Sequence, residues 1–196
     1  MTSNEDKNER QVHDMDRMLI VIDMQNDFID GALGTREATG IVERVAAKIT
    51  RYRQSGDAVV FTRDTHGADY PMTQEGRALP VTHCVKGTNG WEISPLLDTT
   101  GAEILDKPSF GSLELAEHVA GKAPVEIELV GLCTDICVIS NALILKARLP
   151  ETRITVDAGC CAGVTPESHA NALQAMKMCQ IHVIDESSSQ GERSDA

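Results

Sequence analysis

One cysteine, one lysine and one aspartate carry the side chains needed for covalent chemistry, and each follows a separate apolar run. Asp23 ends the first run, Lys107 follows the third, and Cys137 comes after the fourth, in the first turn of an expected helix. The positive end of a helix and a nearby ammonium group both favour a thiolate, so we predict a lowered pKa for Cys137. Asp23 would transfer a proton, and the backbone N–H groups of Cys133 and Cys137 would receive an oxyanion. The set suits acyl transfer through a thioester.

An ordinary core cysteine is the competing interpretation of Cys137, because free cysteine is often buried. Its position on one rim with an aspartate and a lysine favours the reactive interpretation. The C-x₃-C spacing of Cys133 and Cys137 is typical of neither a zinc knuckle nor a thioredoxin-type pair. We expect packing roles for the remaining cysteines, which are Cys84, Cys160, Cys161 and Cys179.

A second group of residues has the chemistry of metal ligands. Asp64 and His66 occupy alternate positions, so the strand has to end and turn at Asp64 for both to reach one ion. His83 would complete the site, and Glu75 lies between the histidines as a fourth candidate. Two histidines with one or two carboxylates suit Zn²⁺ best here, with Fe²⁺ or Mn²⁺ as alternatives. A solvated loop is the other interpretation, but the segment 64–101 is long, and long ordered loops are usually functional.

The elements that must position these residues are short β-rich runs alternating with helical patterns. The runs are 18–23, 58–63, 102–106, 125–131, 153–158 and 181–185. Several are nearly continuous in Val, Ile and Leu, as strands buried on both faces are. Helical patterns cover 41–54, 112–120, 134–150 and 165–178, with Thr134 and Thr165 as expected N-caps.

This order predicts an α/β fold, with a doubly wound, mainly parallel six-stranded sheet and helices on both faces. Ligands of such sheets bind beyond the carboxyl ends of the strands, where the residues above would meet. The remaining histidines, His118, His169 and His182, are expected to be surface or structural residues.

The amino-acid composition argues against several classes of partner. The 196 residues include 30 acidic and 18 basic side chains, which gives a net charge of −12 and argues against nucleic-acid or membrane partners. No apolar run suits a membrane span, and residues 1–17 lack the apolar stretch of a signal peptide, so we expect a cytoplasmic protein. One domain over 18–185 is predicted between a flexible leader, 1–17, and a flexible tail, 186–196.

Several motifs together resemble the isochorismatase-like cysteine hydrolases, and among them the nicotinamidases and related amidases. The motifs are VIDMQNDF (21–28), TRDTH (62–66), THCVKGT (82–88), DKPSFGS (106–112) and GLCTDICV (131–138). The resemblance covers residues 18–184, essentially the whole predicted domain. It implies a flavodoxin-like, three-layer α/β sandwich, in agreement with the alternation of strands and helices.

The resemblance also implies roles for residues. Carried over by motif, the catalytic triad is Asp23, Lys107 and Cys137, and the metal ligands are Asp64, His66 and His83. A cis peptide bond between Leu132 and Cys133 is expected, aiming the amides of Cys133 and Cys137 into one oxyanion hole. The metal would bind the pyridine nitrogen of the substrate.

One departure concerns the metal. Some nicotinamidases have a further histidine between the second and last ligands, whereas 67–82 contains none here and Glu75 is the strongest candidate in that span. The coordination and the metal therefore stay open. Phe28 would supply an apolar wall for a flat ring and Trp91 would close the pocket, with core packing as the alternative role of both.

The implied function is metal-assisted hydrolysis of a small amide, such as nicotinamide to nicotinate and ammonia, in NAD salvage. The alternatives are a cysteine hydrolase of carbamoyl or ureido compounds, which generally lack the metal set, and a non-catalytic binding or redox-responsive module. Isochorismatases lack the nucleophilic cysteine, so Cys137 argues against that branch. Relatives are commonly dimers or tetramers, so we expect a homo-oligomer.

Overall fold

Six parallel strands form one sheet in the order β3-β2-β1-β4-β5-β6 in the computed structural model, which describes residues 17–185. The strands are β1 (Arg17–Ile22), β2 (Ala58–Asp64), β3 (Glu103–Lys107), β4 (Glu126–Leu132), β5 (Arg153–Ala162) and β6 (His182–Ile184). All six predicted strands are confirmed, and so is the doubly wound α/β architecture. The expected flexible leader and tail fall on residues 1–16 and 186–196, outside the described part, whereas Arg17 opens β1.

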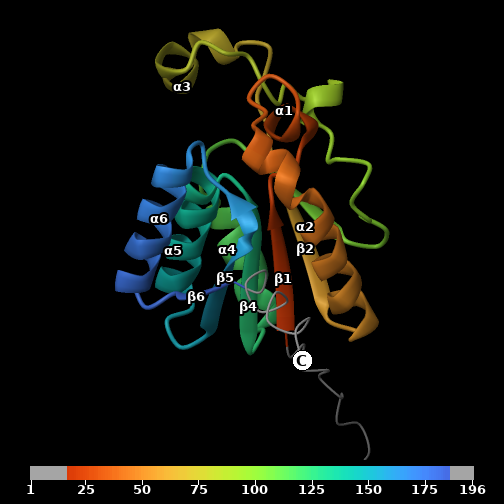
Figure 1. Cartoon of the computed structure of the whole chain (residues 1–196), viewed down its shortest axis with the longest axis vertical. Helices are drawn as coiled ribbons and strands as arrows, with labels where there is room; N and C mark the ends of the chain where they lie inside the picture. The colour runs from red at the N-terminus through yellow and green to blue at the C-terminus, as the bar shows by residue number, and fades with distance from the viewer. Residues whose placement is uncertain (1–16, 186–196) are drawn as a thin grey trace, which may run out of the picture.

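The two central strands, β1 and β4, are buried on both faces because each face meets a different layer of helices. Leu19 and Val21 pack into the core cluster under α2 (Arg36–Gln54). Ile20 and Leu129 pack into the opposite cluster, under α4 (Leu113–Lys122), α5 (Ile139–Arg148) and α6 (Pro166–Met178). Figure 1 shows α2 on one side of the sheet and these three helices on the other. The result is the predicted three-layer sandwich.

Side-chain caps fix where several helices begin. Thr165 accepts a hydrogen bond from the backbone N–H of Ser168, whose side chain in turn accepts from Thr165, so α6 begins with a capping box. Ser112 caps α4 by accepting from the N–H of Leu115. The Thr165 cap was predicted, because a serine or threonine before proline at the first helical position is a strong start signal.

The predicted helix over 134–150 has a different beginning. Residues Thr134–Val138 form a π-helical turn, η3, and the α-helix α5 starts only at Ile139. Thr134 is not an N-cap, because its hydroxyl contacts His169 instead of a backbone N–H. The expectation was wrong because a local cap signal cannot anticipate a partner in another element.

The last part of the long insert after β2 runs back along the sheet to the start of β3, and its first part lies beyond the carboxyl ends of the strands, at the top of Figure 1. It contains only short elements, η1 (Tyr70–Met72), α3 (Gln74–Ala78) and η2 (Asn89–Trp91), while α1 (Asn26–Ile29) follows β1 at the same end. None of the helices within 17–185 has the length and apolar character needed to cross a bilayer.

Candidate active site

Three elements bring the predicted triad together at the carboxyl edge of the sheet. Asp23 follows β1, Lys107 is the last residue of β3, and Cys137 lies in η3. Lys107 Nζ is 2.7 Å from Asp23 Oδ2 and 3.4 Å from Cys137 Sγ. Asp23 and Lys107 are fully buried, and Cys137 is 4 % exposed. A thiol, a carboxylate and an ammonium group thus lie together in one buried part of the molecule.

Asp23 is held by its own backbone and by a neighbouring strand. Its φ of 47° lies in the left-handed region, which few residues other than glycine adopt. The hydroxyl of Thr62, on β2, donates to Asp23 Oδ1 at 2.7 Å and accepts from the Asp23 N–H at 3.2 Å. Burial raises the pKa of Asp23, although the charge of Lys107 opposes the shift. A carboxylate with a raised pKa is suited to accept and return a proton.

The Cys137 thiol has a raised pKa, contrary to the prediction of a lowered one. Burial is the main cause, and the negative charge of Asp23 adds to it, while the charge of Lys107 only partly compensates. Cys137 lies within a π-helical turn directly before α5, and not in the first turn of an α-helix as expected. The thiol is therefore protonated at rest, and a base has to take its proton before it can attack.

The four candidate metal ligands form one compact group. One atom from each of Asp64, His66, Glu75 and His83 lies within 4.8 Å of those of the other three. His66 Nε2 is 2.8 Å from Asp64 Oδ2 and 3.6 Å from Glu75 Oε1, and His83 Nε2 is 3.7 and 3.8 Å from the same two atoms. β2 ends at Asp64, as these side chains require. Two nitrogens and two carboxylate oxygens therefore face one point.

The donors of this group suit a divalent cation. The Nδ1–H of His83 donates to the carbonyl of Val81 at 2.8 Å, which leaves Nε2 free to bind a metal. The buried Nε2 of His66 has no hydrogen bond of good geometry within the described residues. The pKa of Asp64 is held below its usual value, because His66 and Lys107 outweigh the effect of burial. An orphaned imidazole nitrogen beside an ionised carboxylate fits a bound metal.

Sequence reasoning missed Gln25, which is fully buried and connects the two groups. Its side-chain N–H₂ donates to the carbonyls of Asp64 and Trp91, and its side-chain oxygen accepts from the Asp64 N–H at 2.7 Å. A glutamine two residues past a buried strand was the available signal, because a buried amide needs several partners. Gln25 therefore fixes the backbone of a candidate metal ligand.

A mainly apolar cavity of about 260 Å³ opens between the two groups. Its lining includes Asp64, His83, Cys133 and Cys137, so the candidate nucleophile and two of the candidate metal ligands border one space. The other lining residues are Phe28, Leu33, Thr35, Ala38, Leu79, Phe110, Ile136 and Val164. Phe28 lies where an apolar wall was predicted, and the peptide bond between Leu132 and Cys133 is cis, as expected.

Trp91 does not line this cavity, so the expectation that it closes the pocket needs correction. Its indole N–H donates to the hydroxyl of Thr65 at 2.8 Å, and the guanidinium of Arg63 lies 3.6 Å from the ring centroid. These contacts hold η2 of the insert against the end of β2. Trp91 thus supports the insert from outside the cavity.

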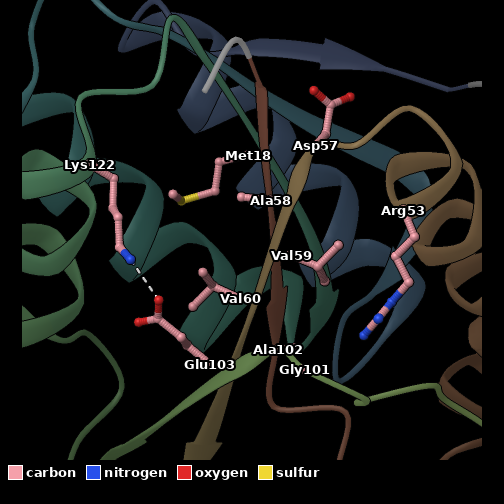
Figure 2. Close-up of a pocket in the computed structure, with 10 residues that line it drawn as sticks. All are labelled: Met18, Arg53, Asp57, Ala58, Val59, Val60, Gly101, Ala102, Glu103 and Lys122. Atoms are coloured by element: carbon pink, nitrogen blue, oxygen red, sulfur yellow. Dashed lines mark hydrogen bonds and ion pairs between the residues drawn. The ribbon is translucent and has the colours of Figure 1, made fainter. Parts of the chain in front are cut away.

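A separate hollow of about 210 Å³ lies at the opposite edge of the sheet, near the starts of β1, β2 and β3 (Figure 2). Its lining includes Met18, Arg53 and Lys122, with Lys122 bonded to Glu103. The lining contains neither cysteine nor histidine. The chemistry-bearing residues are therefore concentrated at the carboxyl edge.

Comparisons with known proteins agree with this geometry. The nicotinamidase/pyrazinamidase of Mycobacterium tuberculosis is 28 % identical over 186 residues, covering 86 % of this chain and 98 % of that protein. An uncharacterized isochorismatase family protein of Bacillus subtilis is 32 % identical over 177 residues, covering 81 % and 93 %. The pyrazinamidase of Pyrococcus horikoshii, solved in complex with zinc, superposes with a TM-score of 0.77 at 28 % identity, covering 87 % and 99 %.

The family model of the isochorismatase domain matches residues 17–188, which include all of the described part. The match begins at the first residue of β1 and includes both the triad and the metal-ligand group. The chain therefore belongs to the isochorismatase domain family.

Proposed function

We propose that this protein is a cysteine amidohydrolase that cleaves nicotinamide, or a closely similar aromatic amide, to the carboxylic acid and ammonia. The observation that carries the proposal is the position of Lys107 Nζ, within 3.4 Å of both Asp23 and Cys137, beside a cavity that the metal-ligand group also borders. Relatives named nicotinamidase support the choice of amide.

The first step requires Asp23 to take the proton of the Cys137 thiol. Both groups are buried and their pKa values are raised, so the transfer places a thiolate beside the Lys107 ammonium. The thiolate then attacks the amide carbonyl, and the N–H groups of Cys133 and Cys137 would hold the oxyanion. Asp23 returns its proton to the leaving ammonia, which completes the thioester.

The second half of the reaction reuses the same groups. Asp23 accepts a proton from a water molecule, which attacks the thioester, and Cys137 leaves as a thiol. Lys107 stays charged throughout, because Asp23 and Asp64 surround it within 3.2 Å. Its role is to hold the carboxylate and thiolate in place and to stabilise their negative charge.

Asp64, His66, Glu75 and His83 would hold a divalent metal at the end of the cavity. When bound, it would orient the substrate by accepting a ring nitrogen as a ligand. Two imidazoles and two carboxylates fit zinc, with Fe²⁺ or Mn²⁺ as alternatives, and a zinc complex of a relative supports the first choice. His83 lies 5.5 Å from Phe28 between ring centroids, so a flat ring bound here would face an apolar wall.

We also propose a cytoplasmic homo-oligomer, a dimer or a tetramer, that acts in NAD salvage on a small-molecule substrate. The reduced state of the cysteines is consistent with this setting, since all six are free thiols. The domain proposed for this activity is the single unit 18–185.

The test is ammonia release by purified protein from nicotinamide and from an N-carbamoyl amino acid, with metal content measured on the same sample. We expect release from nicotinamide, about one metal per chain, and loss of turnover in Cys137→Ala. Cys179→Ala changes an exposed cysteine and is the matched control. Release only from the carbamoyl compound by metal-free protein would instead favour the ureido and carbamoyl hydrolases. No turnover of either would favour a binding module.

A further inference from the structure

The segment that carries the nucleophile is joined to the start of α6 at two points. Thr134 Oγ1 lies 2.8 Å from His169 Nδ1. The carboxylate of the next residue, Asp135, accepts the N–H of Val164 at 3.1 and 3.3 Å. Both contacts join η3 to residues far along the chain.

Among the described residues, the hydroxyl of Thr134 has one hydrogen-bond partner, the Nδ1 of His169 at 2.8 Å. Thr134 is fully buried and is the first residue of η3. Its backbone carbonyl accepts the N–H of Ile139, while the carbonyl of Cys133 accepts that of Val138 at 3.0 Å. π-helical turns are rare and frequently found at functional sites. The hydroxyl of Thr134 therefore needs its partner, His169, where this turn begins.

His169 is held firmly enough to act as an anchor. It lies in the first turn of α6, which the capping box of Thr165 and Ser168 fixes. Gly163 packs so closely that a Cβ there would lie 2.9 Å from the Cβ of His169. Burial lowers the pKa of His169, so its imidazole is neutral at neutral pH and offers one donor and one acceptor nitrogen.

We propose that His169 is a positioning residue for Cys137, acting through Thr134. The hydrogen bond sets the start of η3, and three residues later the same turn presents Sγ of Cys137 at 3.4 Å from Lys107 Nζ. His169 is not among the residues that line the cavity, so it acts without touching substrate. The change that we expect in kcat rests on the proposed function, whereas the change that we expect in the position of Cys137 does not.

The first test compares two polar replacements of His169 that differ in side-chain length. His169→Asn keeps a polar atom near the position of Nδ1, whereas His169→Gln places its polar group near Nε2. We expect His169→Asn to keep kcat for nicotinamide within about threefold, and His169→Gln to lower kcat about tenfold with little change in KM, because small misplacements of a reacting group reduce the rate strongly. His182→Leu changes an exposed histidine and is the control.

The second test is independent of any substrate. Iodoacetamide alkylation of Cys137, followed by mass spectrometry of its peptide, should slow several-fold in His169→Gln and not in His169→Asn. Alkylation of the exposed Cys179 in the same sample is the control for the activity of the reagent. The double variant Thr134→Val with His169→Gln should be alkylated no more slowly than the slower of the two single variants. Both substitutions remove the same hydrogen bond, so their effects should not add.

Equal kcat and alkylation rates in the Asn and Gln variants, or additive losses in the double variant, would overturn the inference. Thermal melting separates a loss of fold from a loss of position, because the proposal expects the two variants to differ in kcat at similar Tm. If the wild-type protein releases no ammonia from any amide, the proposed function fails, while the alkylation rates still decide the role of His169.

Discussion

At the scale of single residues, burial sets the chemistry of the triad. Asp23, Lys107 and Cys137 are buried, so each charge depends on the others for stabilisation. The pKa of Asp23 and of Cys137 is raised mainly by burial, which favours a neutral thiol at rest. Lys107 lies between two carboxylates, 2.7 Å from Asp23 and 3.2 Å from Asp64, and its pKa is raised by their charges. The resting site is thus a protonated thiol beside a buried ion pair.

Replacing Asp23 by asparagine should separate two of its effects. Turnover should fall by a factor on the order of 10²–10⁴, because the proton acceptor is lost. The pKa of Cys137 should fall at the same time, because the negative charge that raises it is removed while Lys107 remains. Alkylation of Cys137 near neutral pH should therefore become faster, measured by peptide mass spectrometry. Slower or unchanged alkylation would contradict this charge assignment, and Asp98→Asn at the surface is the control.

Lys107→Met should destabilise the fold in a pH-dependent way. Removing one partner of a buried ion pair costs about 3–5 kcal/mol, because an uncompensated charge remains. The pKa of Asp23 in the folded variant would then rise further above its unfolded value, so folding would take up a proton. The loss of stability should therefore be largest at high pH and shrink as pH falls through that folded pKa.

Urea unfolding of Lys107→Met at about pH 8 and about pH 5 measures this difference. Lys122→Met removes a lysine from a partly exposed pair with Glu103 and should have little effect at either pH. An equal loss of stability at both values of pH in Lys107→Met would argue that Asp23 is not an uncompensated charge in that variant.

At the scale of elements, the site depends on how the ends of three strands are held against the insert. Gln25 joins the end of β1 to the end of β2 and to η2 through hydrogen bonds to Asp64 and Trp91. Trp91 and Arg63 add a stacked contact on the outer side. The insert that supplies His83 and Glu75 is therefore positioned by groups outside the metal-ligand set.

Gln25→Leu should weaken metal binding without removing a ligand. The N–H and carbonyl of Asp64 lose their partner, so the carboxylate of Asp64 is no longer held toward the histidines. Loss of such supporting contacts typically lowers metal affinity 10–100-fold. Competition with a zinc chelator measures the change, and Gln54→Leu at the end of α2 is the control. Unchanged zinc affinity would show that the insert alone orients Asp64.

Gly131 allows β1 and β4 to approach closely just before the nucleophile. Its φ is +115°, and a Cβ there would lie 2.1 Å from the carbonyl oxygen of Ile22. Gly131→Ala should therefore cost more than about 1–3 kcal/mol, the range for a strained backbone position alone. Gly121→Ala, in α4 with open space around it, should be neutral or stabilise by up to about 1 kcal/mol. Similar melting temperatures of the two variants would contradict this packing.

At the scale of the whole molecule, the fold could be predicted from patterns in the amino-acid sequence. The buried strand β1 is a nearly continuous apolar run, β4 is rich in Ile, Leu and Val, and α6 begins at a capped proline, so these elements were predictable. The ends of β1, β3 and β4 also located Asp23, Lys107 and Cys137. These elements were predictable because each depends mainly on the pattern of its own residues.

Features that depend on distant partners were not predictable. The π-helical start of η3 requires His169 from α6, and the raised pKa of Cys137 requires burial beside Asp23. Of the two roles expected for Trp91, the buried side chain agrees with packing and not with closing the pocket, because Thr65 and Arg63 hold it outside the cavity. Gln25 was passed over because its three partners lie on other segments.

The most direct test of the proposed mechanism is a search for the thioester itself. Purified protein is mixed with nicotinamide, quenched in acid within the first turnovers, and examined by mass spectrometry of the Cys137 peptide. We predict a nicotinoyl adduct on Cys137 in the wild type. An adduct on another residue, or ammonia release by Cys137→Ala at the wild-type rate, would contradict the assignment of Cys137 as the nucleophile.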